Sequence, residues 1–562
     1  MQSAFLILAV FMLVLTILVK PVGIYMAPIC KGSAPILLKK FDEKLLQILG
    51  LKNYSQTWSE YAYSLIFFNI LGILVLFLMQ RLQTYLPLNP EEFKNIESYS
   101  AFNTAISFVT NTNWQSYSGE VYMSFFIQMA GLALQNFLSA ATGIAVAFVL
   151  MRSLVAKQEI YLGNFFTDIL RISLYILLPL AFFYAIFLVS QGCIQNFNEY
   201  VDISTLANTN QTIPMGPVAS QEAIKMLGTN GGGFFNANSA HPFENPNEWT
   251  NFSQCLAIFI ISAALCYTFG IIVNDVRQGW TIYIAMSIIF VIFASLMIIF
   301  ESEVSPYLLQ EGIDPNSFNT EGKETRFALG QSTLFSTVTT SASCGAVNNM
   351  HDSLNPLSGL LTMLLMQIGE VVFGGVGSGF YGIFIFIFLT VFIASLMIGR
   401  TPEYLGKKFT PIQMKLIAIS ALCSPFLVLL ATAITCLFDF NIESLNNAQA
   451  HGFSEYLYAF SSVANNNGSA FAGLNANTPF FNIVTALCMF FGRFTVIICI
   501  LCCAGSIAKQ KITPSSVGSL PTYGLFFSFL IVSTVILIGA LTFLPSLALG
   551  PVVEHLQIFY KG

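Results

Sequence analysis

Long, uninterrupted apolar runs dominate the chain, and short polar segments separate them. Each of ten runs is long enough to cross a bilayer, which takes about 20 helical residues. Because the runs are continuous rather than alternating, they predict helices and not the strands of a membrane barrel. The run 357–399 is too long for one straight span and contains a cluster of glycines. The ten runs lie near 3–25, 61–80, 125–151, 172–193, 252–274, 280–300, 357–399, 413–438, 480–508 and 523–548.

A second pattern occurs four times between these runs. In each copy a short semi-apolar segment, too short to span a bilayer, precedes a polar loop, and an apolar run follows. The loops read TNTNWQ (110–115), TNGGGF (229–234), SCGAVN (343–348) and NNGSAF (466–471). Aligning Thr112, Gly231, Gly345 and Gly468 gives intervals of 119, 114 and 123 residues, and such near-constant spacing is typical of internal repeats. In this alignment the first loop has Thr where the others have Gly.

These loops suit a re-entrant segment that lines a pore. Irregular backbone is tolerated at membrane depth only where protein or a water-filled cavity surrounds it. Backbone carbonyls from four loops can replace the water shell of a cation, and Gly allows a positive φ and close approach. The loops contain no carboxylate, which favours a monovalent ion over a hard divalent one. For any single loop the ordinary alternative is an Asn/Gly turn. We predict an all-α polytopic membrane protein with ten transmembrane helices and four helix–pore-loop–helix repeats in pseudo-fourfold symmetry.

Composition and charge agree with this class. Hydrophobic residues make up 55% of the 562 residues and charged residues only 9%, with a mean hydropathy of +0.71, which excludes a soluble protein of this size. The net charge of −5 gives no sign of nucleic-acid binding. One set of alternating loops carries 16 of the 23 Lys and Arg residues, so that set is predicted to be cytoplasmic and both termini extracytoplasmic. The opposite loops are acidic, with Glu301 and Asp314 as examples.

Two charged residues fall deep inside apolar runs, far from the ends of those runs. Glu370 and Arg493 are expensive at that depth, so they indicate a functional site, unless they form a mutually neutralising structural pair. Arg400 ends the same region as Glu370. The segment GSGFYG (377–382) fits a dinucleotide-binding pattern, but apolar membrane sequence flanks it on both sides, so we reject that reading. Clustered glycines in a span more often mark a break or close packing.

The motifs TNTNWQSYSGE, GTNGGGFFNANSAHPFENP, SASCGAVNNMHDSLNP and ANNNGSAFAGLNANTP resemble those of the KdpA family, the potassium-binding component of the bacterial Kdp potassium-transporting ATPase, over the whole chain. The resemblance implies potassium as the substrate ion, an ion route past Glu370, Arg400 and Arg493, and a gating loop at Gly374, Gly375, Gly377 and Gly379. In the pore-loop interpretation, Cys344 acts through its backbone carbonyl and not through its thiol. The implied filter residues are Asn111, Thr112, Asn113, Gln115, Thr229, Asn230, Gly231, Gly232, Ser343, Cys344, Gly345, Asn466, Asn467 and Gly468.

The same resemblance implies a four-part complex in a bacterial inner membrane, in which the partners are KdpB, a P-type ATPase, and the small subunits C and F. The chain contains no GxxxxGK[ST] loop and no DKTG sequence, so a partner would use the ATP and no cofactor is expected here. A free-standing potassium channel or symporter of the same superfamily is the alternative. The predicted segments are 1–60 (first helix and loop), 61–152, 153–275, 276–400 and 401–511 (pore repeats one to four) and 512–562 (tenth helix and C-terminus).

Overall fold

The computed structural model describes residues 1–562 except 36–37, 52–53, 514–519 and 561–562, so part of the predicted segment 512–562 lies outside it. Within the described residues, ten helices are long and apolar enough to cross a membrane, as predicted. They are α1 (Gln2–Cys30), α3 (Trp58–Arg81), η4 with α5 (Ile127–Val155), α6, η5 and α7 (Phe165–Ser190), α9 (Glu248–Ile272), α10 (Val276–Glu301), α14 (Ser378–Met397), α15 (Pro411–Cys436), α17 (Pro479–Ala508) and α18, η9 and α19 (Leu525–Tyr560).

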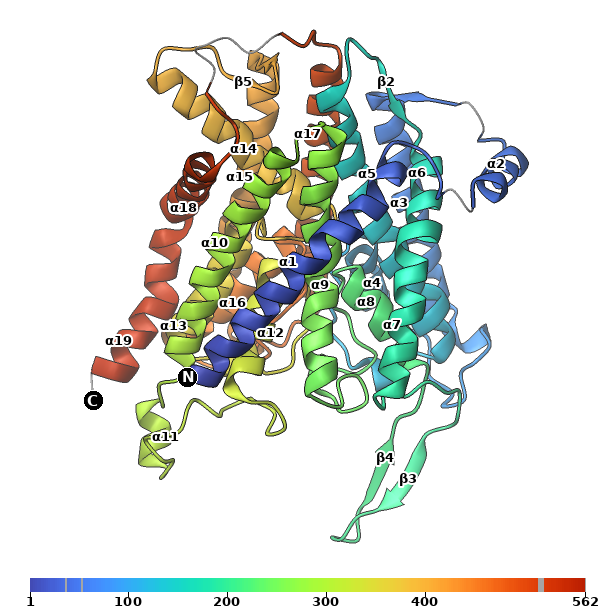
Figure 1. The fold of residues 1–562 in the computed structure, drawn as a ribbon. Helices are drawn as coiled ribbons and strands as arrows, with labels where there is room; N and C mark the ends of the chain where they lie inside the picture. The colour runs from blue at the N-terminus through green and yellow to red at the C-terminus, as the bar shows by residue number, and fades with distance from the viewer. Residues whose placement is uncertain (36–37, 52–53, 514–519, 561–562) are drawn as a thin grey trace.

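Four shorter helices each lie between two spans and lead into one of the four polar loops. They are α4 (Ser98–Val109), α8 (Val218–Leu227), α12 (Leu329–Ser341) and α16 (Gln449–Asn465). The order of span, short helix, loop and span therefore occurs four times, with α1 and α18 (Leu525–Leu547) outside these units (Figure 1). The helix–pore-loop–helix architecture predicted from the loop spacing is confirmed.

The glycine-rich run 357–399 is broken, as its length predicts. Its first part forms the short helix α13 (Pro356–Gln367), residues 368–377 form an irregular segment, and only then does α14 begin. At the other spans local signals set the helix starts. Thr57 caps α3 in a capping box with Glu60, and Thr478 caps α17 ahead of Pro479, whose fixed φ suits the first helical turn.

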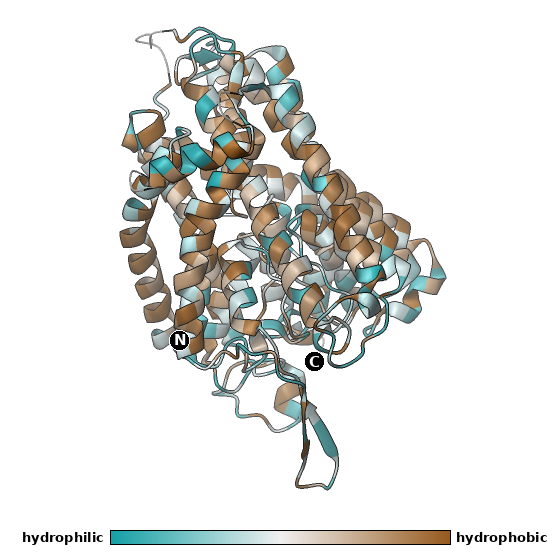
Figure 2. Cartoon of the chain, turned by 90° about the vertical axis from the view of Figure 1, so that its right-hand side faces the viewer, coloured by the Kyte–Doolittle hydropathy of each residue, from teal (hydrophilic) through white to brown (hydrophobic). Residues whose placement is uncertain are grey.

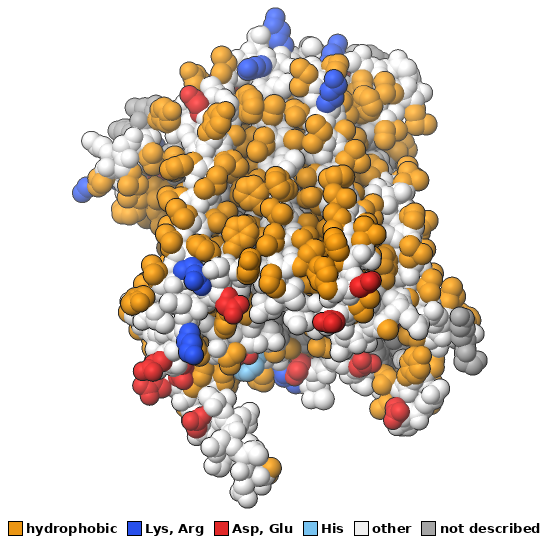
Figure 3. All heavy atoms as spheres, turned by 180° about the vertical axis from the view of Figure 1, so that it is seen from behind, with side chains coloured by type: hydrophobic (Ala, Val, Ile, Leu, Met, Phe, Trp, Pro, Cys, Tyr) orange, Lys and Arg blue, Asp and Glu red, His pale blue; other side chains and the backbone are white. Residues whose placement is uncertain are grey.

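The surface of the spans is apolar, as expected for helices that face the lipid of a membrane. Exposed Leu, Ile and Phe side chains cover the outer faces of the spans, and apolar colour dominates the helices in Figure 2 while polar colour gathers in the loops. Figure 3 shows an apolar belt, with Lys and Arg prominent at one end and most of the visible Asp and Glu at the other. On this face the basic side chains are concentrated towards one end and the acidic side chains towards the other.

Both ends of the chain lie at the end that carries the hairpin of β3 (Val201–Ser204) and β4 (Asn210–Ile213) (Figure 1). The helix α11 (Pro306–Gln310) lies there too. The opposite end carries the small remaining elements: α2 (Lys39–Ile48), β1 (Gln56–Thr57) paired with β2 (Tyr161–Gly163), and β5 (Glu403–Tyr404) paired with β6 (Lys407–Lys408).

Candidate ion-binding site

Each of the four loops has a residue in the left-handed region of φ at its first or second position. These residues are Asn111 (φ 67°), Thr229 (φ 48°), Ser343 (φ 52°) and Asn466 (φ 63°), and none is glycine. Such backbone costs about 1–3 kcal/mol per residue and gathers at ligand sites. Each short helix ends at its loop, so its partial negative end faces the same place. The four loops share one backbone geometry as well as one sequence pattern.

This geometry corrects the alignment of the first loop. Two residues after the first left-handed position stand Asn113 (φ 55°), Gly231 (φ 94°), Gly345 and Gly468 (φ 99°). Asn113, and not Thr112, is therefore the counterpart of the glycines. The alignment of the four loops by residue type did not detect this, because Asn, like Gly, tolerates a positive φ. The register of the first loop is therefore shifted by one residue from the predicted one.

The first three loops are joined edge to edge. Asn111 Nδ2 of the first loop donates to the Thr229 carbonyl of the second at 3.1 Å, and Asn230 Nδ2 donates back to Asn111 Oδ1 at 2.5 Å. The Gly345 amide of the third loop lies 3.4 Å from the Asn230 carbonyl. These four residues are buried, as is Ser139, which also donates to Asn111 Oδ1.

The fourth loop closes the ring. Ser343 Oγ donates to the Asn466 carbonyl at 2.7 Å, and Asn466 Nδ2 donates to Thr112 Oγ1 at 2.9 Å. Asn467 Nδ2 bonds back to the Thr339 carbonyl of α12 at 3.0 Å. The loops therefore form one continuous ring in the order one, two, three, four and back to one.

The glycines allow the loops to approach this closely. A Cβ added at Gly231 would lie 2.1 Å from the Gly345 amide nitrogen, and one at Gly468 would lie 1.9 Å from the Thr112 carbonyl oxygen. Real Cβ atoms do not make such contacts, so the neighbouring backbone would have to move. Gly232 is less confined, since its added Cβ would meet the Asn113 side chain at 2.9 Å.

Several carbonyl oxygens of the ring are available to a ligand. Those of Thr112 and Asn467 accept no hydrogen bond from any residue that the structure describes. The Cys344 carbonyl, in contrast, accepts a hydrogen bond from Thr339 Oγ1, so one of its two lone pairs is already used. The Cys344 thiol is buried. The atoms of the ring that are available to bind an ion are oxygens and not sulfur.

A vestibule of about 780 Å³ lies over the ring, and residues of all four loops line it. Gln115 spans the first two loops at this mouth: its Nε2 donates to the Gly233 carbonyl at 3.2 Å and its Oε1 accepts from the Gly233 amide at 3.0 Å. His351 also lines the vestibule; burial and then Lys323 lower the pKa of His351 to about 3, so it brings no positive charge.

Glu301, which the sequence analysis placed in an acidic polar loop, does not face solvent. Glu301 is fully buried; its carboxylate lies 2.6 Å from Lys323 Nζ and accepts the Asn355 amide at 2.8 Å. It braces the loops around the vestibule.

The irregular segment 368–377 lies against the underside of the ring. The Val376 amide donates to Thr229 Oγ1 at 2.9 Å, and a Cβ added at Gly375 would lie 3.0 Å from Ser343 Cβ. This segment has its own left-handed residues, among them Glu370 (φ 49°) and Phe373 (φ 56°). Of the glycines predicted to form a gating loop, only Gly375 therefore meets the ring directly. The others pack beneath it: a Cβ added at Gly377 would lie 2.1 Å from Gly143 of α5, and one added at Gly374 would lie 2.1 Å from Gly379.

Glu370 and Arg493 line one cavity of about 90 Å³ beside Asn466, below the fourth loop. Both are buried, at 3% and 5% exposure, yet no ion pair joins them among the described contacts. The alternative of a directly neutralising pair is thus not what the structure contains. Glu370 Oε1 has no hydrogen-bond partner within the described chain. Arg400 is exposed beyond the end of α14 and does not line this cavity.

Sequence reasoning missed a group of residues behind the second loop. Lys225 falls in a polar, outward segment of the sequence but is completely buried in α8, and Asn238 connects it to the Gly231 carbonyl. The detectable signal was its position: Lys225 stands four residues before Thr229, where the other short helices carry Ser or Thr. Val376, which contacts the ring through its amide, left no signal.

Fold and ring together define a polytopic membrane protein whose four re-entrant loops close into one ring, the candidate ion site. Its fold is similar to that of the potassium transporter TrkH from Vibrio parahaemolyticus, with a TM-score of 0.53 and 15% identity over 89% of this chain and 98% of that one. The sequence model of the family "Potassium-transporting ATPase A subunit" matches residues 9–556, so the chain belongs to that family.

Individual relatives are similar over almost the full length. The potassium-transporting ATPase potassium-binding subunits of Yersinia enterocolitica and Serratia proteamaculans are each 54% identical over 557 residues, covering 99% of both chains. The protein of the same name from Dechloromonas aromatica is 51% identical over 588 residues, again covering 99% of both chains.

Proposed function

We propose that this chain binds potassium in the ring of four loops and passes it on as the potassium-binding subunit of a potassium-transporting ATPase. The names of the relatives support the ion and the assembly. The observation that carries the proposal is the closed ring itself, with a left-handed residue at the first or second position of each loop and unbonded carbonyls at Thr112 and Asn467. Carbonyls in such a ring substitute for the water shell of a monovalent cation.

The route we propose runs from the vestibule through the ring to the cavity at Glu370 and Arg493. Segment 368–377 serves as the gate, because it contacts both Thr229 and Ser343 from below. A buried carboxylate at the cavity attracts a cation, and the Arg493 guanidinium limits how long it stays. Arg400, exposed and outside the cavity, would act only at the exit.

ATP hydrolysis belongs to a partner in this proposal. The sequence has no phosphate-binding or phosphorylation motif, and the partners we propose are the P-type ATPase KdpB and the small subunits C and F. The membrane is a bacterial inner membrane, with both termini and the β3–β4 hairpin outside. A tag inserted at Leu206, which is fully exposed at the hairpin tip, should react with a non-permeant antibody on spheroplasts without lysis.

Purification of the tagged chain in mild detergent tests the assembly. We expect a P-type ATPase to co-purify, with hydrolysis stimulated by potassium in the wild type and lost in Gly345→Asp. That substitution adds a side chain whose Cβ lies 3.1 Å from the Asn467 carbonyl oxygen, and so brings a carboxylate into the ring. Autonomous potassium flux through the lone chain in liposomes, without any co-purifying ATPase, would instead support a channel or symporter.

A further inference from the structure

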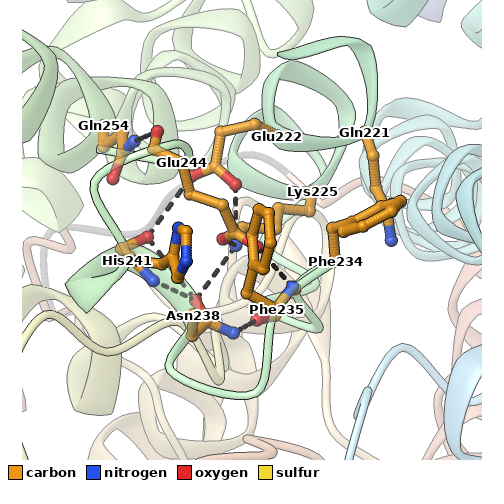
Figure 4. Close-up of polar contacts among 12 residues, drawn as sticks. Gln221, Glu222, Lys225, Phe234, Phe235, Asn238, His241, Glu244 and Gln254 are labelled. Atoms are coloured by element: carbon orange, nitrogen blue, oxygen red, sulfur yellow. Dashed lines mark hydrogen bonds and ion pairs between the residues drawn. The ribbon is translucent and has the colours of Figure 1, made fainter. Parts of the chain in front are cut away.

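A buried charge cluster stands directly behind the second loop (Figure 4). Lys225 of α8 forms ion pairs with two carboxylates, Glu222 at 2.7 Å and Glu244, and all three side chains are at most 1% exposed. Its third contact is Asn238 Oδ1 at 3.0 Å. An ammonium group has three hydrogens, so every donor of Lys225 has a partner.

Asn238 relays this cluster to the ion site. Its Nδ2 donates to the Gly231 carbonyl at 2.6 Å while its Oδ1 accepts from Lys225. The amide is thus fixed in one orientation, since reversing it would place an NH₂ group against an ammonium. Asn238 itself has a φ of 55° and is 7% exposed, so the backbone is held in an uncommon conformation to present this side chain.

The other short helices use the same position for the same purpose. Four residues before the first left-handed residue of the loop they carry Ser107, Thr339 and Ser462, where α8 has Lys225. Ser107 Oγ donates to the Trp114 carbonyl at 2.9 Å, Thr339 Oγ1 donates to the Cys344 carbonyl, and Ser462 Oγ accepts the Gly468 amide at 2.9 Å.

This position is therefore the anchor by which each helix holds its own loop. Three of the anchors are short hydroxyls in direct contact with the loop backbone. The second repeat differs twice: its anchor carries a charge, and it reaches the loop through an intervening amide. Support of the loop backbone needs only a hydroxyl, as in the other three repeats. The use of a charged Lys225 and an intervening Asn238 in the second repeat therefore requires a separate explanation.

We propose that Lys225, acting through Asn238, is a specificity-determining positioning pair that fixes the Gly231 carbonyl and thereby the preference of the ring for potassium over sodium. The inference rests on the proposed function, since it assumes that the ring is the ion site. A smaller ion binds well only if the oxygens can move inward around it. The hydrogen bond from the Asn238 amide, which Lys225 orients, opposes that movement at a close crossing of two loops, where Gly231 meets Gly345.

Two substitutions at Asn238 separate the lost donor from any added charge. Asn238→Asp keeps the size and the contact with Lys225 but cannot donate to Gly231. Asn238→Gly removes the side chain and suits the positive φ, so it folds even where the Asp variant fails to. Asn236→Asp, on the same loop and exposed, adds the same charge as a control.

The assay is displacement of bound radioactive rubidium from the purified full chain by potassium or by sodium. Both Asn238 variants should lower the potassium-to-sodium preference up to about tenfold, the factor that corresponds to one hydrogen bond between neutral groups. Asn236→Asp should keep the wild-type preference. An unchanged potassium-to-sodium preference in Asn238→Gly overturns the inference. If the preference falls only in Asn238→Asp, the inference is also overturned, because the added charge would then be the cause. Absence of displaceable rubidium in the wild type would instead overturn the proposed ion site.

Discussion

Adding one methyl group at Gly468 should damage potassium binding through a neighbouring loop. The new Cβ of Gly468→Ala would lie 1.9 Å from the Thr112 carbonyl oxygen, and at least 3.0 Å is needed. The carbonyl must therefore retreat by about 1 Å, or Gly468 must leave its φ of 99°. Loss of one oxygen ligand to a charged group is worth about 1.5–3 kcal/mol, so the potassium dissociation constant should rise about ten- to hundredfold.

A second glycine provides the matched control for this substitution. Gly312 has a similar φ of 90°, but nothing lies within 4 Å of an added Cβ. Gly312→Ala thus introduces the same backbone strain without the steric contact, and its potassium isotherm should equal that of the wild type. The isotherms would be measured by rubidium displacement on purified protein. Wild-type affinity in Gly468→Ala, or equal damage in Gly312→Ala, would refute the close-packed ring.

Four further outcomes are expected. Arg493→Ala should leave rubidium binding intact and lower potassium-stimulated ATP hydrolysis of the complex, and normal turnover would rule out its role in the ion route. Gly377→Ala should slow the same hydrolysis, because its Cβ would lie 2.1 Å from a carbonyl of α5, whereas Gly382→Ala, with 3.5 Å to its nearest neighbour, should not; equal rates would argue against a gate. Cys344→Ser should bind potassium almost normally, since the thiol is not a ligand; a large loss would implicate the sulfur. Burial lowers the pKa of His451, but hydrogen bonds to two carboxylates outweigh it and raise that pKa to about 10. This stabilisation is complete below pH 6.5 and is lost as the pH rises through about 10, so the melting temperature should fall over that range in the wild type but not in His451→Gln.

The sequence predicted the spans and the loops because both leave a local signal. A long continuous apolar run has few structural alternatives to a membrane helix. The glycine cluster after Glu370 indicated the break in the helix before α14. The register of the first loop was wrong by one residue, because backbone conformation and not residue identity defines it, and Asn113 can adopt the conformation that Gly231 adopts.

Contacts between distant residues were beyond sequence reasoning. The position of Lys225 within its repeat marks it as unusual, but its burial also depends on Glu244, which lies 19 residues further along the chain. The separation of Glu370 and Arg493 within one cavity likewise depends on how α17 packs. Side-chain partners of this kind are decided by tertiary packing, and a single sequence records only that a charge exists.

The ring is built from four different loops of one polypeptide, and this has a practical consequence for its study. In a channel assembled from identical subunits, any change to the filter is repeated on every side at once. Here a codon change alters a single wall while three walls stay native. The ion affinity of the ring can thus be changed one loop at a time. Substitutions that would abolish binding in a symmetric pore should here cause partial, measurable losses of affinity.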